Sequence, residues 1–286
     1  MDFLESSMDR RRFLSASAMA LGALTEFGFA EPPLASADSV AVQRLSWAGV
    51  RIQTDRSTVF FDPWTNASIW GGVWKQEIVP VEVVTPARFV CLTHMHNDHF
   101  DPATLRKIFP EIRGAVLCAE EAVASVAALG VPVRAVKLNE AKALNEWLFT
   151  PVPAVDGLGD PQVSWIAEVR GLKFIHCGDT LWHGYLRHIG RQHGPFDVAF
   201  LPINGPRLPA LQPSVSVPAV LTPEQAVEAG ILLRAKLVVP IHYGLNSPGD
   251  YEEYPNAEKT FLEAADRRGV KVRIVKPGEE FRLSVG

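Results

Sequence analysis

The chain has 286 residues, 47% of them hydrophobic and 21% charged, and a net charge of −4. This is the composition of an ordinary globular protein, long enough for one large domain or two small ones. The charge gives no reason to expect nucleic acid or an anionic membrane surface as a partner. The three cysteines form no C-x-x-C pair, so they predict no disulfide framework.

The N-terminal segment has the pattern of an export signal. The pair Arg10-Arg11 precedes an uncharged run at 13–25, and Ala35-Ser36-Ala37 offers the small residues of a cleavage site. The run is too short to anchor the chain in a bilayer, and the paired arginines resemble the twin-arginine signal. We therefore predict a signal peptide over 1–37, export by the twin-arginine translocase to the periplasm or beyond, and a mature domain over 38–286 without a membrane anchor.

The mature part alternates short apolar runs with a few helical stretches. Strands are predicted over 41–47, 50–53, 58–61, 89–92, 115–118, 133–136, 146–150, 163–169, 173–176, 198–202, 237–241 and 271–275. Helices are predicted over 102–108, 120–129, 257–268 and from Thr222 onward, where Thr222, Pro223 and Gln225 have the pattern of a capping box. Strands in both halves with helices between them favour two sheets packed face to face and covered by helices.

A cluster of metal-binding side chains follows the predicted strand at 89–92. The segment Thr93-His94-Met95-His96-Asn97-Asp98-His99 carries three imidazoles and a carboxylate within six residues. On a loop at a strand end these groups can converge on a small volume. Imidazole nitrogen and carboxylate oxygen are suitable ligands for zinc, iron or manganese, so the segment predicts a metal site.

This segment resembles the H-x-H-x-D-H motif of the metallo-β-lactamase superfamily. Asp62-Pro63, Gly178-Asp179-Thr180 and the strand end at His242 also resemble elements of the family, nearest to the branches with N-acyl-phosphatidylethanolamine phospholipase D and ascorbate phosphate lactonase. The resemblance implies an α+β fold, the αββα four-layer sandwich. It also implies two divalent metal ions, zinc first, with manganese or iron as alternatives. The implied ligands are His94 and His96 for the first metal, Asp98, His99 and His242 for the second, and Asp179 as the bridge.

One position departs from the family pattern. Where the family places a third histidine for the first metal, this chain has Asp156 in the phrase Val152-Pro153-Ala154-Val155-Asp156. Asp156 is expected to be the ligand, which adds an oxygen donor and shifts the preference toward manganese or iron. The alternative is that the first metal is lost, or that His183 or, after it, His176 replaces the missing histidine. With Asp156 the three carboxylates lower the net charge of the site, which weakens its Lewis acidity.

The implied activity is hydrolysis by metal-bound hydroxide of a phosphodiester, lactone or amide/ester bond in a small molecule. Asp98 or His183 is expected to transfer the proton at the leaving group. One alternative is a di-iron or related oxidoreductase on the same fold, and another is a non-catalytic metal-binding protein. A nuclease is less favoured, because the mature length leaves no room for a large inserted domain.

Three further residues are candidates for contact with the substrate. Trp70 and Trp74 lie in an aromatic loop that could cover the metals, with ordinary core packing as the alternative. Asn204 follows a predicted strand and could stabilise an oxyanion, or it could belong to a plain turn. His188 and His193 are interpreted as surface residues of a polar loop.

Overall fold

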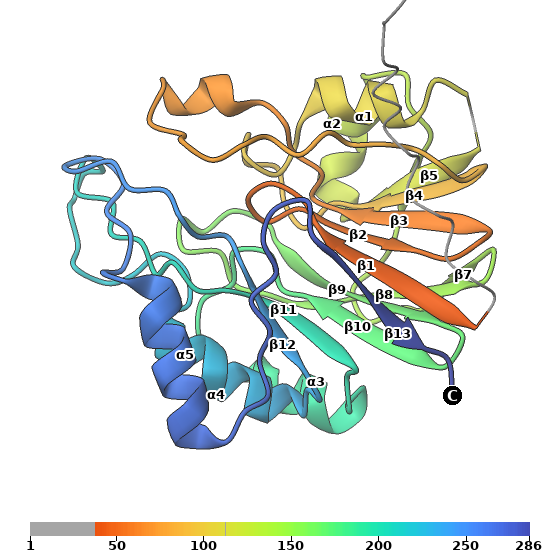
Figure 1. Cartoon of the computed structure of the whole chain (residues 1–286). Coiled ribbons are helices and arrows are strands. Elements are labelled where there is room, and N and C mark those ends of the chain that lie inside the picture. Colours follow the sequence, from red (N-terminus) through yellow and green to blue (C-terminus); the bar gives the residue numbers. More distant parts are fainter. Residues whose placement is uncertain (1–37, 112) are drawn as a thin grey trace, which may run out of the picture. The chain divides into compact units, whose positions relative to one another are not determined.

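The computed structural model describes residues 38–111 and 113–286, so the predicted signal peptide lies outside the described residues. Two β-sheets dominate this part of the chain (Figure 1). No helix within the described ranges is long and apolar enough to cross a membrane.

The first sheet has the strand order β13-β1-β2-β3-β4-β5-β6. Its pairs are antiparallel from β13 to β3 and parallel from β3 to β6. The strands are β1 (Ser39–Arg44), β2 (Val50–Gln53), β3 (Ser57–Phe61), β4 (Ala87–Cys91), β5 (Gly114–Cys118), β6 (Val133–Ala135) and β13 (Glu280–Ser284).

The second sheet has the order β12-β11-β10-β9-β8-β7. Its pairs are parallel from β12 to β10 and antiparallel from β10 to β7. The strands are β7 (Lys142–Leu144), β8 (Trp147–Pro153), β9 (Val163–Val169), β10 (Leu172–His176), β11 (Val198–Pro202) and β12 (Val238–Ile241).

Helices cover the outer face of each sheet (Figure 1). On the first sheet these are α1 (Pro102–Ile108) and α2 (Val123–Ala127), and on the second α3 (Tyr185–Gln192), α4 (Pro223–Leu233) and α5 (Ala257–Arg268). Two 3₁₀ turns, η1 (Ala67–Trp70) and η2 (Glu120–Ala122), lie in the connections.

The layers follow from the alternation of side chains along buried strands. In β4, Phe89 points into the core between the sheets, whereas Val90 points into the core beneath α1 and α2. In β11, Phe200 faces the other sheet and Leu201 faces the helices. Each strand is therefore apolar on both faces, as expected for strands buried on both sides. The predicted αββα sandwich is confirmed.

Most predicted elements are present, and the exceptions have physical causes. The helices predicted over 102–108 and 257–268 have the predicted bounds, but the one predicted over 120–129 is η2 followed by α2. The strand predicted over 271–275 is wrong, because this segment makes only an isolated bridge at Val272. The edge strands β7 and β13 and the polar helix α3 were not predicted. Helix α3 buries only Leu186, Ile189 and Gly190, which is too little apolar surface for a clear periodicity.

The capping box of α4 provides a test of local stability. The Thr222 hydroxyl accepts a hydrogen bond from the Gln225 backbone amide, and the Gln225 side chain accepts one from the Thr222 amide. Thr222→Ala removes the cap and should lower the free energy of unfolding by about 1 kcal/mol. Thr222→Ser keeps the hydroxyl and should remain near wild type in denaturant titrations. Equal losses in both variants would show that the cap does not stabilise α4.

Candidate metal centre

The site lies where parallel strands end. Asp62 follows β3, the histidine segment 94–99 follows β4, Asp179 follows β10, and Asn204 and His242 follow β11 and β12. The carboxyl ends of neighbouring parallel strands meet at one edge of a sheet, and open sheets bind ligands there. The topology therefore brings together residues that lie as far as 180 positions apart in sequence.

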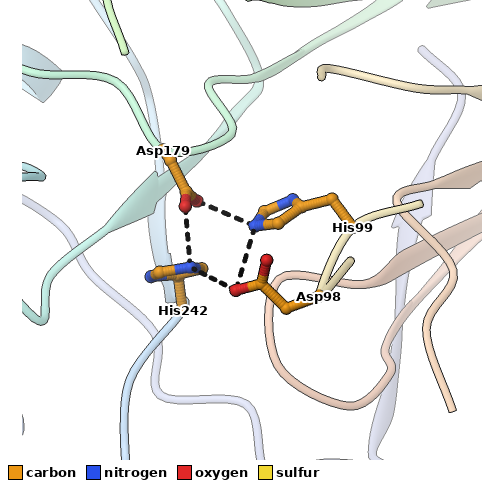
Figure 2. A group of neighbouring side chains, drawn as sticks. All are labelled: Asp98, His99, Asp179 and His242. Carbon is orange, nitrogen blue, oxygen red and sulfur yellow. Dashed lines mark ion pairs between the residues drawn. The ribbon is translucent and has the colours of Figure 1, made fainter. Parts of the chain in front are cut away.

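Asp98, His99, Asp179 and His242 form one close group (Figure 2). The two carboxylate oxygens of Asp179 lie 3.0 Å from His99 Nε2 and 3.0 Å from His242 Nε2. Asp98 Oδ2 lies 3.9 Å from His99 Nε2 and 3.8 Å from His242 Nε2. Two imidazole nitrogens and two carboxylates thus converge on one point.

Several donor atoms of this group lack a hydrogen-bond partner among the described residues, as expected for atoms that bind a metal ion. His99 Nε2, His242 Nε2 and Asp179 Oδ1 are buried and make no hydrogen bond within the described part of the chain. Buried polar atoms normally have a partner, and a bound ion is one accepted explanation when no protein group supplies it. Two nitrogens and carboxylate oxygens form a donor set that suits zinc, iron or manganese. The residues therefore fit a divalent cation.

Hydrogen bonds orient the imidazoles of His99 and His94. Asp62 Oδ2 lies 2.8 Å from His99 Nδ1, and a carboxylate can only accept, so Nδ1 donates. The Thr93 hydroxyl donates to Asp62 at 2.6 Å and therefore accepts from His94 Nδ1 at 2.9 Å. In both histidines this assignment leaves Nε2 for a metal, which is the usual function of such outer partners.

A second pair of residues orients His242. The Asn204 amide nitrogen donates to the Tyr251 hydroxyl at 2.5 Å, so Asn204 Oδ1 accepts from His242 Nδ1 at 3.0 Å. Asn204 is fully buried and does not line the cavity at the site. The predicted contact of Asn204 with substrate is therefore not supported, and its observed partner is His242.

His96 is held by a carboxylate that the sequence did not reveal. Its Nε2 lies 2.8 Å from Asp160 Oδ2, which leaves Nδ1 free as a ligand atom. That Nδ1 lies 3.0 Å from His94 Nε2. With the tautomers assigned above, two lone pairs face each other there, an arrangement that a cation stabilises. His94, His96 and Asp179 form a second group of converging donors, and Asp179 belongs to both groups.

Asp156 lies beside this second group. Its Oδ2 is 3.9 Å from His96 Nδ1, and its Oδ1 accepts hydrogen bonds from the backbone amides of Leu158 and Asp160. One oxygen thus fixes the turn at 156–160 while the other faces the ligand nitrogen. The structure groups Asp156 with His96 and Asp160.

The two histidines considered as replacements lie elsewhere. His176 Nε2 lies 2.8 Å from the backbone oxygen of Ala48, and its ring stacks on Phe61, so its contacts are those of a core residue. His183 belongs to none of the donor groups found among the described residues. Its predicted proton transfer therefore has no geometric support, and Asp98, which lines the cavity, remains the candidate.

Burial and mutual attraction set the charges of the site. Burial lowers the pKa of His94 to about 3, so this imidazole is neutral at neutral pH. Burial alone would raise the pKa of Asp98, but His99 and His242 lower it to about 2. Burial would lower the pKa of His99, but Asp179, Asp98 and Asp62 raise it well above the usual value. The carboxylates thus favour positive charge at the point where the donors converge.

Three residues around the site have left-handed backbone conformations. The φ angles are 57° at Trp47, 41° at Asp62 and 56° at His242. Bulky residues rarely adopt such angles, and outliers of this kind cluster at functional sites. At Trp47 the conformation accompanies two contacts, because its indole Nε1 donates to Asp98 Oδ2 at 3.0 Å and its carbonyl accepts from the His242 amide.

A cavity of about 420 Å³ opens onto the site. Its polar end comprises His96, Asp98, Asp179 and His242, and its other walls are mainly apolar. Trp70 lines it, as predicted for a substrate contact. Trp74 does not, because it is buried in the core against Trp47 and Trp64; the core-packing alternative holds for that residue.

The remaining histidines and Cys177 lie outside the donor groups. His188 lies on α3 and His193 at its end, not in a loop, although His188 is exposed as expected. Cys177 is fully buried and packs in the apolar cluster beneath α3 and α4. Trp47, Asp160 and Tyr251 were missed, since a lone Trp, Asp or Tyr in a loop carries no local signal of its partner.

A model of the β-lactamase superfamily domain matches residues 57–243. The chain belongs to the β-lactamase superfamily. A UPF0173 metal-dependent hydrolase of Rubrobacter xylanophilus is 31% identical over 211 residues, which cover 67% of this chain and 77% of that protein. The chain is accordingly a metal-dependent hydrolase of this superfamily.

Solved structures agree on the fold of this superfamily member. A metallo hydrolase of Ignicoccus hospitalis superposes with a TM-score of 0.65 at 21% identity, covering 86% of this chain and 99% of that chain. The diiron β-hydroxylase CmlA of Streptomyces venezuelae gives a TM-score of 0.63 at 14% identity, covering 89% of this chain and 55% of that chain. These likenesses concern the fold alone.

The two donor groups predict different losses of metal. His242→Ala removes a donor from the group that contains Asp98 and His99, whereas His96→Ala removes one from the group that contains His94. Each variant should therefore lose part of the bound metal, with the remaining group still occupied. His188→Ala changes an exposed histidine of α3 and should leave the metal content unchanged. Elemental analysis of the purified proteins measures this, and full metal content in both site variants would overturn the assignment.

Proposed function

We propose that this hydrolase binds two divalent metal ions and cleaves a phosphodiester, lactone or amide/ester bond in a small molecule. The observation that carries the proposal is the shared position of Asp179 between two groups of donor atoms. His94, His96 and Asp156 would hold the first metal, Asp98, His99 and His242 the second, and Asp179 both. When bound, such metals act as Lewis acids and lower the pKa of water.

The residues of the chain prepare the site for this chemistry. Asp62, Thr93, Asn204 and Asp160 fix the imidazoles with one nitrogen turned to the centre, so little reorganisation is needed on binding. Asp98 stays ionised because His99 and His242 lower its pKa to about 2, which suits it as a ligand for a cation. A carboxylate this acidic is a weak base, so its expected proton transfer is supported only by its position on the cavity wall.

The metal preference that we propose places zinc first. Asp156 adds a hard oxygen donor, which would make manganese or iron competitive. A di-iron oxidoreductase is the second candidate, favoured by the carboxylate-rich donor set. Such an enzyme needs an electron donor, and the sequence contains no cysteine pair for an iron–sulfur cluster. Zinc or manganese in the isolated protein supports hydrolysis, whereas two irons with oxygen consumption would support the oxidoreductase.

Substitutions of Asp156 test its proposed function as a ligand. Asp156→Asn keeps an oxygen for the turn amides of Leu158 and Asp160 but removes the negative charge, so it separates metal binding from folding. We expect Asp156→Asn and Asp156→Ala to lose metal from the first position and activity with it. Asp156→His should restore part of both and shift selectivity toward zinc. Metal content and thermal melts of the four proteins are compared, and full occupancy in Asp156→Ala would exclude Asp156 as a ligand.

We also propose that the enzyme is exported in the folded state to the periplasm. The support is the N-terminal sequence, in which Arg10-Arg11 precedes an uncharged run and a possible cleavage site. Replacing both arginines with Lys should leave the precursor unprocessed in the cytoplasm, because the twin-arginine route reads the arginine pair. Replacing Arg12 alone is the matched control and should have a weaker effect. Cell fractionation measures the outcome, and unchanged export of the double variant would contradict this route.

A further inference from the structure

An apolar groove continues from the metal cavity along the segment 206–219. It has a volume of about 390 Å³, within the range of small-molecule sites. It shares five lining residues with the metal cavity, so the two spaces adjoin: Gly157, Leu158, Leu208, Leu211 and Ala219.

The groove is lined by apolar side chains that are exposed to water. Leu158, Leu211, Val215 and Val217 are 53%, 48%, 61% and 66% exposed, and the only polar residue among those that line it is Gln212. No charged side chain lines it. Scattered exposed apolar residues need no explanation, but several side by side mark a site of interaction.

Backbone contacts hold the two sides of the groove together. A Cβ on Gly157 would lie 2.1 Å from the backbone oxygen of Ala219, so only glycine allows the Asp156 turn to approach that segment. The Ala219 amide donates to the Pro206 carbonyl at 2.8 Å and closes the base of the segment. The groove therefore has a fixed position relative to Asp156.

We propose that this groove is a substrate subsite that binds a linear apolar group, an alkyl or acyl chain, attached to the bond being cleaved. The inference rests on the proposed hydrolytic function, because the metal cavity would receive the polar end of the same molecule. The polar end of the cavity and the apolar groove match the two ends of an amphiphile. An uncharged apolar chain fits walls whose side chains carry no charge and, apart from Gln212, no hydrogen-bonding group.

Binding of straight-chain carboxylates tests the subsite without turnover. Isothermal titration of the zinc-loaded protein should give affinities that increase roughly fourfold per added methylene, on the order of 200-fold from butanoate to octanoate. Leu211→Asp should abolish most of this increase. Because Leu211 also lines the metal cavity, the quantity compared is the ratio of octanoate to butanoate affinity within each protein. Leu262→Asp, at a leucine of α5 with 41% exposure, is the matched control and should keep the increase. Equal affinities for all chain lengths in the wild type would overturn the proposal.

Alkanols separate this proposal from the metal chemistry. 1-Octanol carries no anionic group, so it should bind more tightly than 1-butanol through Leu211 even in protein stripped of metal. If carboxylates fail to bind but this preference persists, the proposed hydrolytic site is wrong and the subsite stands. If butanoate binds and neither series depends on chain length, the subsite is wrong.

Two other occupants of the groove would also overturn the proposal. Light scattering that shows a dimer in the wild type and a monomer in Leu211→Asp would make this face an interface between copies of the chain. Sedimentation with phosphatidylcholine vesicles that depends on Leu211, without a preference for chain length in solution, would make it a membrane-docking surface. A monomer that ignores vesicles and prefers longer chains supports the subsite.

Discussion

The site depends on the burial of three carboxylates, Asp62, Asp98 and Asp179, in one small volume. Buried ions are costly unless they are paired and hydrogen-bonded. Here His99 lies within reach of all three carboxylates, and His242 lies within reach of two of them. A divalent cation would compensate the negative charge of the carboxylates more completely. The same electrostatic repulsion that makes the empty cluster unfavourable therefore favours cation binding.

The fold supplies the rigidity that this concentration of charge requires. Two sheets pack through a large apolar core, and each sheet is covered by helices on its other face. The candidate ligands project from the ends of buried strands. The imidazole rings are held by hydrogen bonds that they donate to Asp62, Thr93 and Asn204. The left-handed conformations at Trp47, Asp62 and His242 are held in place by these surroundings.

The cavity beside the candidate metal centre is the part of the site that can select a substrate. Metal-assisted hydrolysis serves many bonds on this fold, so the substrate is determined by the walls and not by the ligands. In this chain the other walls are mainly apolar, although Asn97 and Asp250 also line the cavity. Asp156 changes the charge beside His96.

The sequence by itself determined the ligand segment at 94–99, the later motifs at Asp179 and His242, and the bounds of strongly patterned elements such as α1 and α5. These features are local, since short spacings and side-chain periodicity report directly on them. Only the tertiary structure decided that Trp74 packs in the core, that Asn204 contacts His242, and that Asp160 pairs with His96. Such partners are separated by up to 64 positions, and no pattern along the chain encodes a contact made by folding two sheets together.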